Sequence, residues 1–401
     1  MNNRFDAIVV GGGPAGSTCA HRLKRQGKNV VIFDKKQFPR VKPCAGWITP
    51  QVIESIQLDM ADYAKQNTLQ PITSFRTGIL GRRLVETRYE TPVSYGIRRV
   101  EFDDYLLRQS GVDCHHESIS QIERAGGLWR INDRYETPIL IGAGGHFCPV
   151  ARHLRLSAAP NHSPDDQIQV HPDKSKSKSK SKSKSKSKRN GIVVFAQEVE
   201  FKITSDQDDP RHVQAERPEL YFCEDLAGYG WCFRKGDYLN IGLGRIDASD
   251  LSQHVRSFCD YLRKEHKVAG DIPSKFLGHA YQLYASPSHV LGTAGALLIG
   301  DAAGLAYPQS GEGIRPAIES GILAAKVIAD STGEIDAETL SNYAGAIESR
   351  LGPARPLQQM GWLPVSWLQS VAAVLMQTRW FARTQVIEDW FLHRHTQALV
   401  E

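Results

Sequence analysis

The sequence predicts an α/β fold: a Rossmann-type nucleotide-binding domain, interrupted by a mixed β-sheet domain and followed by a C-terminal helical segment. Three observations predict it. Residues 5–34 read as strand, helix and strand, which is the length of one βαβ unit. A second apolar run, ending in glycine and aspartate, lies far along the chain at residues 297–301. Between these segments the middle third of the chain is rich in short strand patterns, as expected for an inserted sheet.

The first strand is expected at residues 5–10, a short apolar run of the kind found in buried parallel strands. A helix pattern over residues 15–26 and a second apolar run over residues 29–33 follow it. Asp34 closes the second run, near the expected position of about 20 residues beyond the glycines. A carboxylate at this place accepts hydrogen bonds from ribose hydroxyls and disfavours a 2′-phosphate.

The glycine segment between the first strand and the helix reads G-x-G-x-x-G. The first glycine allows a tight turn, the second lets the backbone approach a pyrophosphate, and the last permits close packing of helix on strand. The N-terminus of the helix attracts the anion. The residues predicted to contact a dinucleotide here are Gly11, Gly13, Pro14, Ala15 and Gly16.

A second cofactor-binding segment is predicted after the strand at residues 296–299, where Gly300-Asp301 begins a run of small residues. The aspartate can bond a polyol hydroxyl. The next segment, Pro-Gln-Ser-Gly-Glu-Gly-Ile, leads into a helix expected at residues 313–329. The N-terminus of that helix can face the N1/O2 edge of a flavin and stabilise negative charge there. Its predicted contacts are Gly311, Gly313 and Ile314.

The middle of the chain supplies further elements. A helix is expected at residues 99–111 and a strand at residues 137–141, and four strand patterns follow, at residues 191–202, 219–223, 230–233 and 238–243. The predicted division is residues 1–50, 95–155 and 285–330 for the cofactor domain, 51–94 and 190–284 for the β-rich substrate domain, 172–189 for a disordered Lys/Ser loop, and 331–401 for a C-terminal helical cap.

The positive charge of the chain is local. The formal net charge is +5, but residues 174–188 alternate lysine and serine and hold eight lysines, so the remainder is slightly acidic. No nucleic-acid partner is therefore expected. An alternation of charged and small polar residues has no apolar face to bury and predicts a solvated loop. It is either a tolerated repeat expansion or a tether to a polyanion or membrane.

The seven cysteines contain no C-x-x-C pair, and their number is odd. This pattern indicates a reducing, cytoplasmic location rather than a disulfide framework. The sequence has neither a signal-peptide pattern nor an apolar run long enough to span a bilayer. The tryptophan-rich segment 362–391 either packs as a helical cap or lies on a membrane, which leaves peripheral contact with the cytoplasmic membrane face open. No metal site is expected.

The two glycine-aspartate segments carry a resemblance to a known group of enzymes. Their pairing is similar to that of the flavoproteins related to para-hydroxybenzoate hydroxylase, and the chain most resembles the geranylgeranyl reductase family within that group. The resemblance covers most of residues 1–330. It implies FAD as the cofactor, hydride transfer between the flavin and an apolar or isoprenoid-like small molecule, and reduction of a C=C bond.

Three shorter segments add to the resemblance. Arg99 begins a match to R-x-x-F-D, whose arginine reaches FAD, and residues 42–46 resemble K-x-C-G-G, whose cysteine lies near the isoalloxazine. Residues 228–233 resemble the Y-x-W-x-F segment that lines the substrate cavity. The implied contacts are Lys42, Ala45, Gly46 and Arg99 for FAD, Tyr229, Trp231 and Phe233 for the substrate, and Cys44 and Tyr229 as candidate proton donors.

The chain departs from the family pattern at several places. Ala45 replaces a glycine, Ala227 and Arg234 replace prolines that flank the cavity motif, and Gly144 stands where related hydroxylases have aspartate. The last change disfavours aromatic hydroxylation. Two alternatives stay open: a flavin-dependent monooxygenase or halogenase, although the halogenase W-x-W-x-I-P is absent, and a non-catalytic FAD-binding protein. No second G-x-G-x-x-G follows a strand, so NAD(P)H is expected only as a transient reductant. The oligomeric state is not predicted.

Overall fold

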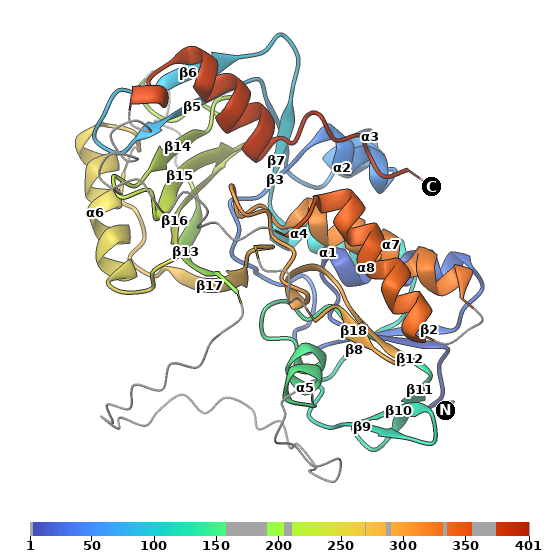
Figure 1. Cartoon of the computed structure of the whole chain (residues 1–401). Coiled ribbons are helices and arrows are strands. Elements are labelled where there is room, and N and C mark those ends of the chain that lie inside the picture. The colour runs from blue at the N-terminus through green and yellow to red at the C-terminus, as the bar shows by residue number, and fades with distance from the viewer. Residues whose placement is uncertain are drawn as a thin grey trace, which may run out of the picture.

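The computed structural model describes residues 3–157, 191–203, 211–268, 270–285, 290–331, 335–354 and 374–400. These residues form a mixed α/β fold with two large sheets and two small ones (Figure 1). The predicted Lys/Ser loop at residues 172–189 lies outside the described residues, as does part of the predicted helical cap.

The first large sheet has six strands in the order β18-β19-β12-β1-β2-β8 and is parallel except at its β18 edge. Its central strands are buried, as expected where helices cover a parallel sheet. The strands are β1 (Ala7–Val10), β2 (Val30–Asp34), β8 (Cys114–His116), β12 (Ile139–Gly142), β18 (Gly292–Thr293) and β19 (Ala296–Leu298). The helices packed on the sheet and on one another are α1 (Pro14–Arg25), α4 (Arg99–Ser110), α5 (Pro149–Ser157), α7 (Ile314–Asp330) and α8 (Ala337–Leu351).

The position of β1 between β12 and β2 determines where the glycine segment lies. Because β1 pairs with both neighbours in parallel, its carboxyl end and theirs meet at one edge of the sheet. Ligands of open α/β sheets bind outside that edge. The short 3₁₀ helix η1 (Gly300–Ala302) follows β19 at the same edge. The two predicted cofactor segments are therefore brought together by the parallel order of the strands.

A small antiparallel sheet of β9 (Ile122–Ala125), β10 (Leu128–Ile131) and β11 (Tyr135–Thr137) connects β8 to β12. The indole of Trp129 donates a hydrogen bond to the carbonyl of Gly295, at 2.9 Å. The single strand predicted over residues 137–141 is in fact two elements, because Thr137 ends β11 and Pro138 separates it from β12. A proline has no N–H to donate to a ladder and is excluded from the interior of a central strand.

The second large sheet has seven strands in the order β17-β13-β16-β15-β14-β5-β6. All of its pairs are antiparallel except β14 with β5. Apolar residues of α6 (Leu251–Lys264) pack on one face of this sheet. The strands are β5 (Ser74–Ile79), β6 (Val85–Arg88), β13 (Val193–Lys202), β14 (Glu219–Phe222), β15 (Gly228–Lys235), β16 (Tyr238–Arg245) and β17 (Leu277–Gln282).

The other face of the seven-stranded sheet packs against the C-terminal part of the chain. There α10 (Arg379–Phe381) runs into η2 (Ala382–Phe391), the red helix above the sheet in Figure 1. The buried ring of Phe391 lies in one cluster with aromatic side chains of the sheet. The second small sheet, of β3 (Trp47–Ile48), β7 (Ser94–Ile97) and β4 (Leu69–Ile72), adjoins the two large sheets together with α2 (Pro50–Ser55) and α3 (Met60–Ala64).

The last described residues, 392–400, contain no helix or strand, which differs from the all-helical cap predicted for this end. Backbone carbonyls of this segment are bound by a buried arginine of α7. The guanidinium of Arg315, which is 1% exposed, pairs with Glu319 at 2.8 Å and donates to the carbonyls of Thr396 at 2.8 Å and His393 at 3.2 Å. A side chain with five N–H donors can satisfy carbonyls that no helix pairs. Within the described residues, no helix is long and apolar enough to cross a membrane.

Candidate active site

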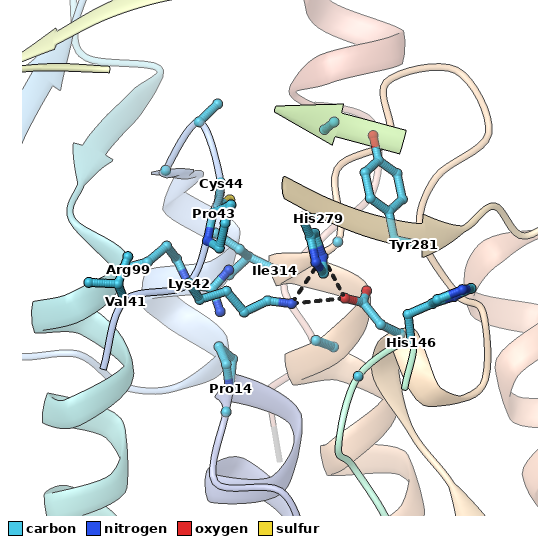
Figure 2. Close-up of a pocket in the computed structure, with 18 of the residues that line it drawn as sticks. Pro14, Val41, Lys42, Pro43, Cys44, Arg99, His146, His279, Tyr281 and Ile314 are labelled. Atoms are coloured by element: carbon cyan, nitrogen blue, oxygen red, sulfur yellow. Dashed lines mark hydrogen bonds and ion pairs between the residues drawn. The ribbon is translucent and has the colours of Figure 1, made fainter. Parts of the chain in front are cut away.

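A cavity of about 340 Å³ lies between the carboxyl edge of the six-stranded sheet and one face of the seven-stranded sheet. Backbone segments that follow β1, β2, β12 and β19 line one side. Side chains of β13, β15 and β17 line the other. Figure 2 shows how the loop at residues 41–44 and the start of α4 approach this space from one direction and β17 approaches it from the other. The cavity is thus built from both large sheets.

The glycine segment after β1 has the backbone that the predicted role requires. Gly11 has a φ of +117°, and a Cβ there would overlap the backbone of Ala143. A Cβ on Gly16 would overlap the carbonyl oxygen of Gly11, so only glycine permits this approach of helix to turn. Gly13 is the N-cap of α1, and no side chain caps that helix end. Pro14 and Ala15 line the cavity beside it. This uncapped N-terminus fits an anionic pyrophosphate.

Asp34 ends β2 and faces the cavity beside the glycine segment. One carboxylate oxygen accepts the backbone N–H of Gly12, and the other accepts that of Lys36, both at 2.9 Å. The guanidinium of Arg40 lies 3.7 Å away. These three contacts hold the carboxylate in one orientation. Carboxylate oxygens have further lone pairs available for ribose hydroxyls.

Asp301 connects the two sides of the cavity through Lys42 and His279. The Lys42 ammonium lies 3.1 Å from the Asp301 carboxylate and 3.2 Å from His279 Nε2, and the dashed lines of Figure 2 mark these contacts. Burial favours the neutral form of Asp301, but the charge of Lys42 and the contact with His279 outweigh it and hold the pKa of Asp301 well below its ordinary value. Burial, with the charge of Lys42, lowers the pKa of His279 to about 4. The site therefore holds one ion pair beside a neutral imidazole at neutral pH.

Gly300, beside Asp301, has a φ of +58° and donates its N–H to Ser320 at 2.9 Å. A Cβ on it would come within 3.1 Å of the Ala15 side chain, although Gly300 itself does not line the cavity. The close packing of this turn against α1 positions Asp301. Gly300 therefore serves the site through its backbone.

Arg99, at the start of α4, lies in the cavity wall and is 7% exposed. Its guanidinium makes two hydrogen bonds to Asp103, at 2.7 and 2.9 Å, and Arg40 lies 3.3 Å from the same carboxylate. The thiol of Cys44 interacts with Arg99. Burial raises the pKa of Cys44, and the positive charge of Arg99 offsets part of that rise. The predicted residues Arg99 and Cys44 are thus in direct electrostatic contact.

The remaining predicted cofactor residues lie in two turns of the cavity wall. Gly46 has a φ of +72°, and a Cβ there would overlap the carbonyl of Ile97. Gly311 has a φ of +67°, and a Cβ there would overlap the hydroxyl of Tyr281. Beside these two turns, the cavity wall also contains Ala45, Gly313 and Ile314. Gly313 is the N-cap of α7, so a helix N-terminus lies at this part of the cavity.

The three predicted substrate residues share one face of β15 but do not all reach the cavity. Tyr229 and Trp231 line it, whereas the fully buried ring of Phe233 lies outside it and stacks on Trp47 with ring centroids 4.9 Å apart. The indole of Trp231 donates to Asn240 at 2.6 Å. The hydroxyl of Tyr229 donates to the carbonyl of Ser310 at 2.5 Å. The hydroxyl proton of Tyr229 is therefore donated in a hydrogen bond to the turn that precedes α7.

The cavity residues that the sequence analysis did not predict include Glu198 of β13, His279 and Tyr281 of β17, and Glu312 before α7. His279 and Tyr281 share one face of their strand because they are two residues apart. That spacing was readable in the sequence, but residues 277–282 had not been predicted to form a strand. Burial raises the pKa of Glu312 to about 7. Glu312 belongs to a segment that the sequence predicts to approach the cofactor, whereas nothing in the local sequence distinguishes Glu198 from a solvated acid.

Known proteins resemble this chain along most of its length. A family profile described as an NAD(P)-binding Rossmann-like domain matches residues 9–42, the strand–helix–strand unit with its glycines. Menaquinone reductase of Mycobacterium tuberculosis is 28% identical over 82% of this chain and 77% of its own length. Geranylgeranyl diphosphate reductase of Rhodobacter capsulatus is 27% identical over 80% of this chain and 74% of its own. These matches confirm the resemblance predicted from the motifs.

Solved structures with the same fold include a geranylgeranyl bacteriochlorophyll reductase-like protein of Thermoplasma acidophilum. It covers 100% of this chain and 94% of its own, with a TM-score of 0.68 and 18% identity. A flavin-dependent brominase covers 97% of this chain and 92% of its own, with a TM-score of 0.65 and 17% identity. At these identities the likeness shows the fold alone.

Proposed function

We propose that this chain, an FAD-dependent oxidoreductase related to the geranylgeranyl reductases, reduces C=C bonds in the isoprenoid chain of a lipid or quinone. One observation carries the proposal: a single cavity joins a flavin-binding frame to a wall of aromatic and apolar side chains. Tyr229, Trp231, Ala196 and Trp47 form the apolar part of this wall, and Glu198 and His279 are polar groups in it. An apolar lining with few polar groups suits an apolar substrate. The printed names of the sequence relatives, which are reductases of geranylgeranyl diphosphate and menaquinone, support the same substrate class.

The cofactor domain is proposed to be the six-stranded sheet with its helices, and the substrate domain the seven-stranded sheet. The N-terminus of α1 would hold the pyrophosphate of FAD, Asp34 its ribose, and Asp301 its polyol chain. The segment 311–314 would face the pyrimidine edge of the flavin, and Arg99, Lys42, Ala45 and Gly46 would enclose the other side. When bound, FAD supplies hydride chemistry. The protein orients the ring, excludes water and supplies protons.

Cys44 and Tyr229 are proposed to act at the reacting end of the cavity. The raised pKa of Cys44 keeps its thiol protonated near neutral pH. The hydroxyl of Tyr229 holds the turn at Ser310 against the sheet, so its main effect is to position that turn and to present its ring to the substrate. Trp231 presents its ring beside Tyr229, with centroids 6.0 Å apart.

The same substrate class suggests contact with the cytoplasmic face of a membrane. Around the start of α10, Val374 is 66% exposed and Trp380 is 70% exposed. Exposed apolar and aromatic side chains of this kind insert at a lipid interface. NAD(P)H is proposed as a transient electron donor, because no permanent second nucleotide domain is predicted from the sequence.

Anaerobic turnover tests the proposed function. The protein is reconstituted with FAD, reduced with dithionite and incubated with geranylgeranyl diphosphate or with a menaquinone in detergent. The expected product has gained two hydrogens for each reduced bond, as measured by mass spectrometry. Parallel aerobic reactions with NADPH and bromide address the alternatives: a product that gains oxygen or bromine, with no hydrogenated product, would replace the reductase assignment. FAD bound tightly without turnover of any substrate would favour a binding protein.

A further inference from the structure

Glu198 is a buried acid in the cavity wall with no role assigned so far. It lies on β13, and its side chain shares one face of that strand with Ala196 and Glu200 because strand side chains alternate. The residue is 5% exposed and lines the cavity together with Cys44 and Trp231. An acid this deeply buried is costly to keep unless it is paired or has a function.

The hydrogen bonds of Glu198 leave one oxygen free. The carboxyl interacts with the backbone N–H of Cys44 and with the side-chain amide of Asn240. Its Oε2 atom has no hydrogen-bond partner among the residues that the structure describes. Asn240 is itself fully buried and accepts the indole N–H of Trp231 at 2.6 Å. The acid is therefore held from one side, while its second oxygen is buried at the cavity wall without a partner among the described residues.

Most of the charged side chains around Glu198 form ion pairs or hydrogen bonds with residues other than Glu198. On β15, the buried Lys235 donates to Glu200 at 2.7 Å and to the carbonyl of Ile97 at 3.0 Å. Glu200 also pairs with Arg98 at 2.9 Å. The neighbouring strand β17 contributes His279, whose lowered pKa keeps it neutral.

On the remaining side of Glu198, the loop before β3 contributes the thiol of Cys44, with Arg99 behind it. Near neutral pH no unpaired positive charge among these neighbours faces Glu198. Burial raises the pKa of Glu198 to about 7, although the attraction of Lys235 offsets part of the rise. The carboxyl can therefore both hold and release a proton at physiological pH, which is what a general acid requires.

We propose that Glu198 is the general acid of the reduction, the group that gives the proton to the substrate double bond. This inference rests on the proposed function. In the step, the O–H bond of the Glu198 carboxyl breaks and a C–H bond forms at one alkene carbon, while the adjacent carbon takes the hydride of the reduced flavin. The double bond is reduced, the flavin is oxidised, and the Glu198 carboxylate regains its proton from water. Tyr229 is excluded from this step because its hydroxyl donates to Ser310.

A pH profile of single turnover tests the assignment. The FAD-reconstituted enzyme is reduced anaerobically and mixed with saturating geranylgeranyl diphosphate, and flavin reoxidation is followed between pH 5.5 and 9. The wild-type rate should fall as the pH rises through about 7, because Glu198 loses its proton. Glu198→Gln keeps the shape of the side chain and should be about 100-fold slower, without that pH dependence. Glu198→Asp should keep a pH-dependent rate.

Two control variants separate the possible donors. Cys44→Ser should retain the pH dependence of the rate. If Cys44 were the proton donor, this variant would lose that dependence. Glu265→Gln, at the exposed end of α6, should behave as wild type. Flavin content and KM should be unchanged in Glu198→Gln, which a merely structural role of Glu198 would alter. A Glu198→Gln rate within about two-fold of wild type, with the same pH dependence, would overturn the assignment.

Infrared spectroscopy of the protein without substrate gives an independent measurement. The difference spectrum between wild type and Glu198→Gln should contain the C=O band of a neutral carboxyl at pH 6, and the band should be lost by pH 8. If no polyprenyl compound is reduced but this band titrates near pH 7, the proposed function fails and the protonation of Glu198 stands. If reduction occurs and no such band exists, the proposed function stands and only the assignment of Glu198 as the general acid fails.

Discussion

The two walls of the cavity are built in opposite ways. The wall next to the six-stranded sheet depends on tight backbone turns: Gly46 and Gly311 line the cavity, Gly11 follows β1 behind it, all three have positive φ, and at each of them a Cβ would overlap a neighbouring group. The wall from the seven-stranded sheet is made of side chains that stand on strands, such as Trp231 and Glu198. A wall of backbone can bind one shape of cofactor, whereas a wall of side chains can be varied to fit many substrates. The shared fold of reductases and a brominase agrees with this division.

The backbone wall should be the more sensitive of the two to a single methyl group. Gly11→Ala adds a Cβ that overlaps the Ala143 backbone at a φ of +117°, so we expect a loss of about 2 kcal/mol or more in the free energy of unfolding. Flavin should be absent from the purified variant, as measured by absorbance and thermal unfolding. The matched control is Gly12→Ala, whose Cβ would meet only side chains, the ring of Phe38 at 3.2 Å and Ile32 at 3.6 Å. Equal flavin content in both variants would contradict a backbone-built site.

The buried acid of the side-chain wall should make stability depend on pH. The pKa of Glu198 is about 7 in the folded protein and about 4.3 when unfolded. Between these values the folded state holds a proton that the unfolded state has lost, so stability should fall as the pH rises from about 4 to 7. The contribution of Glu198 to that fall is about 3 kcal/mol. Urea denaturation at several pH values should show a smaller fall for Glu198→Gln, and an identical slope in both proteins would contradict the raised pKa.

The smallest effects should separate the aromatic residues that share one face of β15. Trp231→Leu shortens a side chain in the cavity wall, so KM for the polyprenyl substrate should rise about 10-fold with flavin binding intact. Phe233→Leu changes a buried ring that stacks on Trp47 outside the cavity. It should cost about 1 kcal/mol of stability and leave KM within two-fold. Steady-state kinetics measures KM and thermal unfolding measures stability for both variants. A larger change in KM for Phe233→Leu than for Trp231→Leu would reverse the assignment of these two rings.

Predictability from the sequence follows the same division between backbone and side chains. The strand–helix–strand unit and its glycines were predicted closely, with α1 at Pro14–Arg25 and β2 at Val30–Asp34. The sequence predicted less about the surroundings of β15. Strand alternation predicted that Tyr229, Trp231 and Phe233 share a face, but not that Phe233 lies beyond the cavity. Which part of a sheet face is covered by a distant segment is not encoded in the strand itself.

The sequence by itself determined the strand–helix–strand unit in which we propose that the dinucleotide binds. A tight turn, an uncapped helix N-terminus and an acid at the end of the next strand are local features, and their steric requirements can be read from residues 5–34. Only the tertiary structure decided the contacts between distant segments. Lys42 meets His279 and Asp301, which are 237 and 259 residues away along the chain. It also decided the burial of Glu198. Burial, which turns an ordinary acid into one that titrates near pH 7, depends on everything packed around the residue and not on its neighbours in sequence.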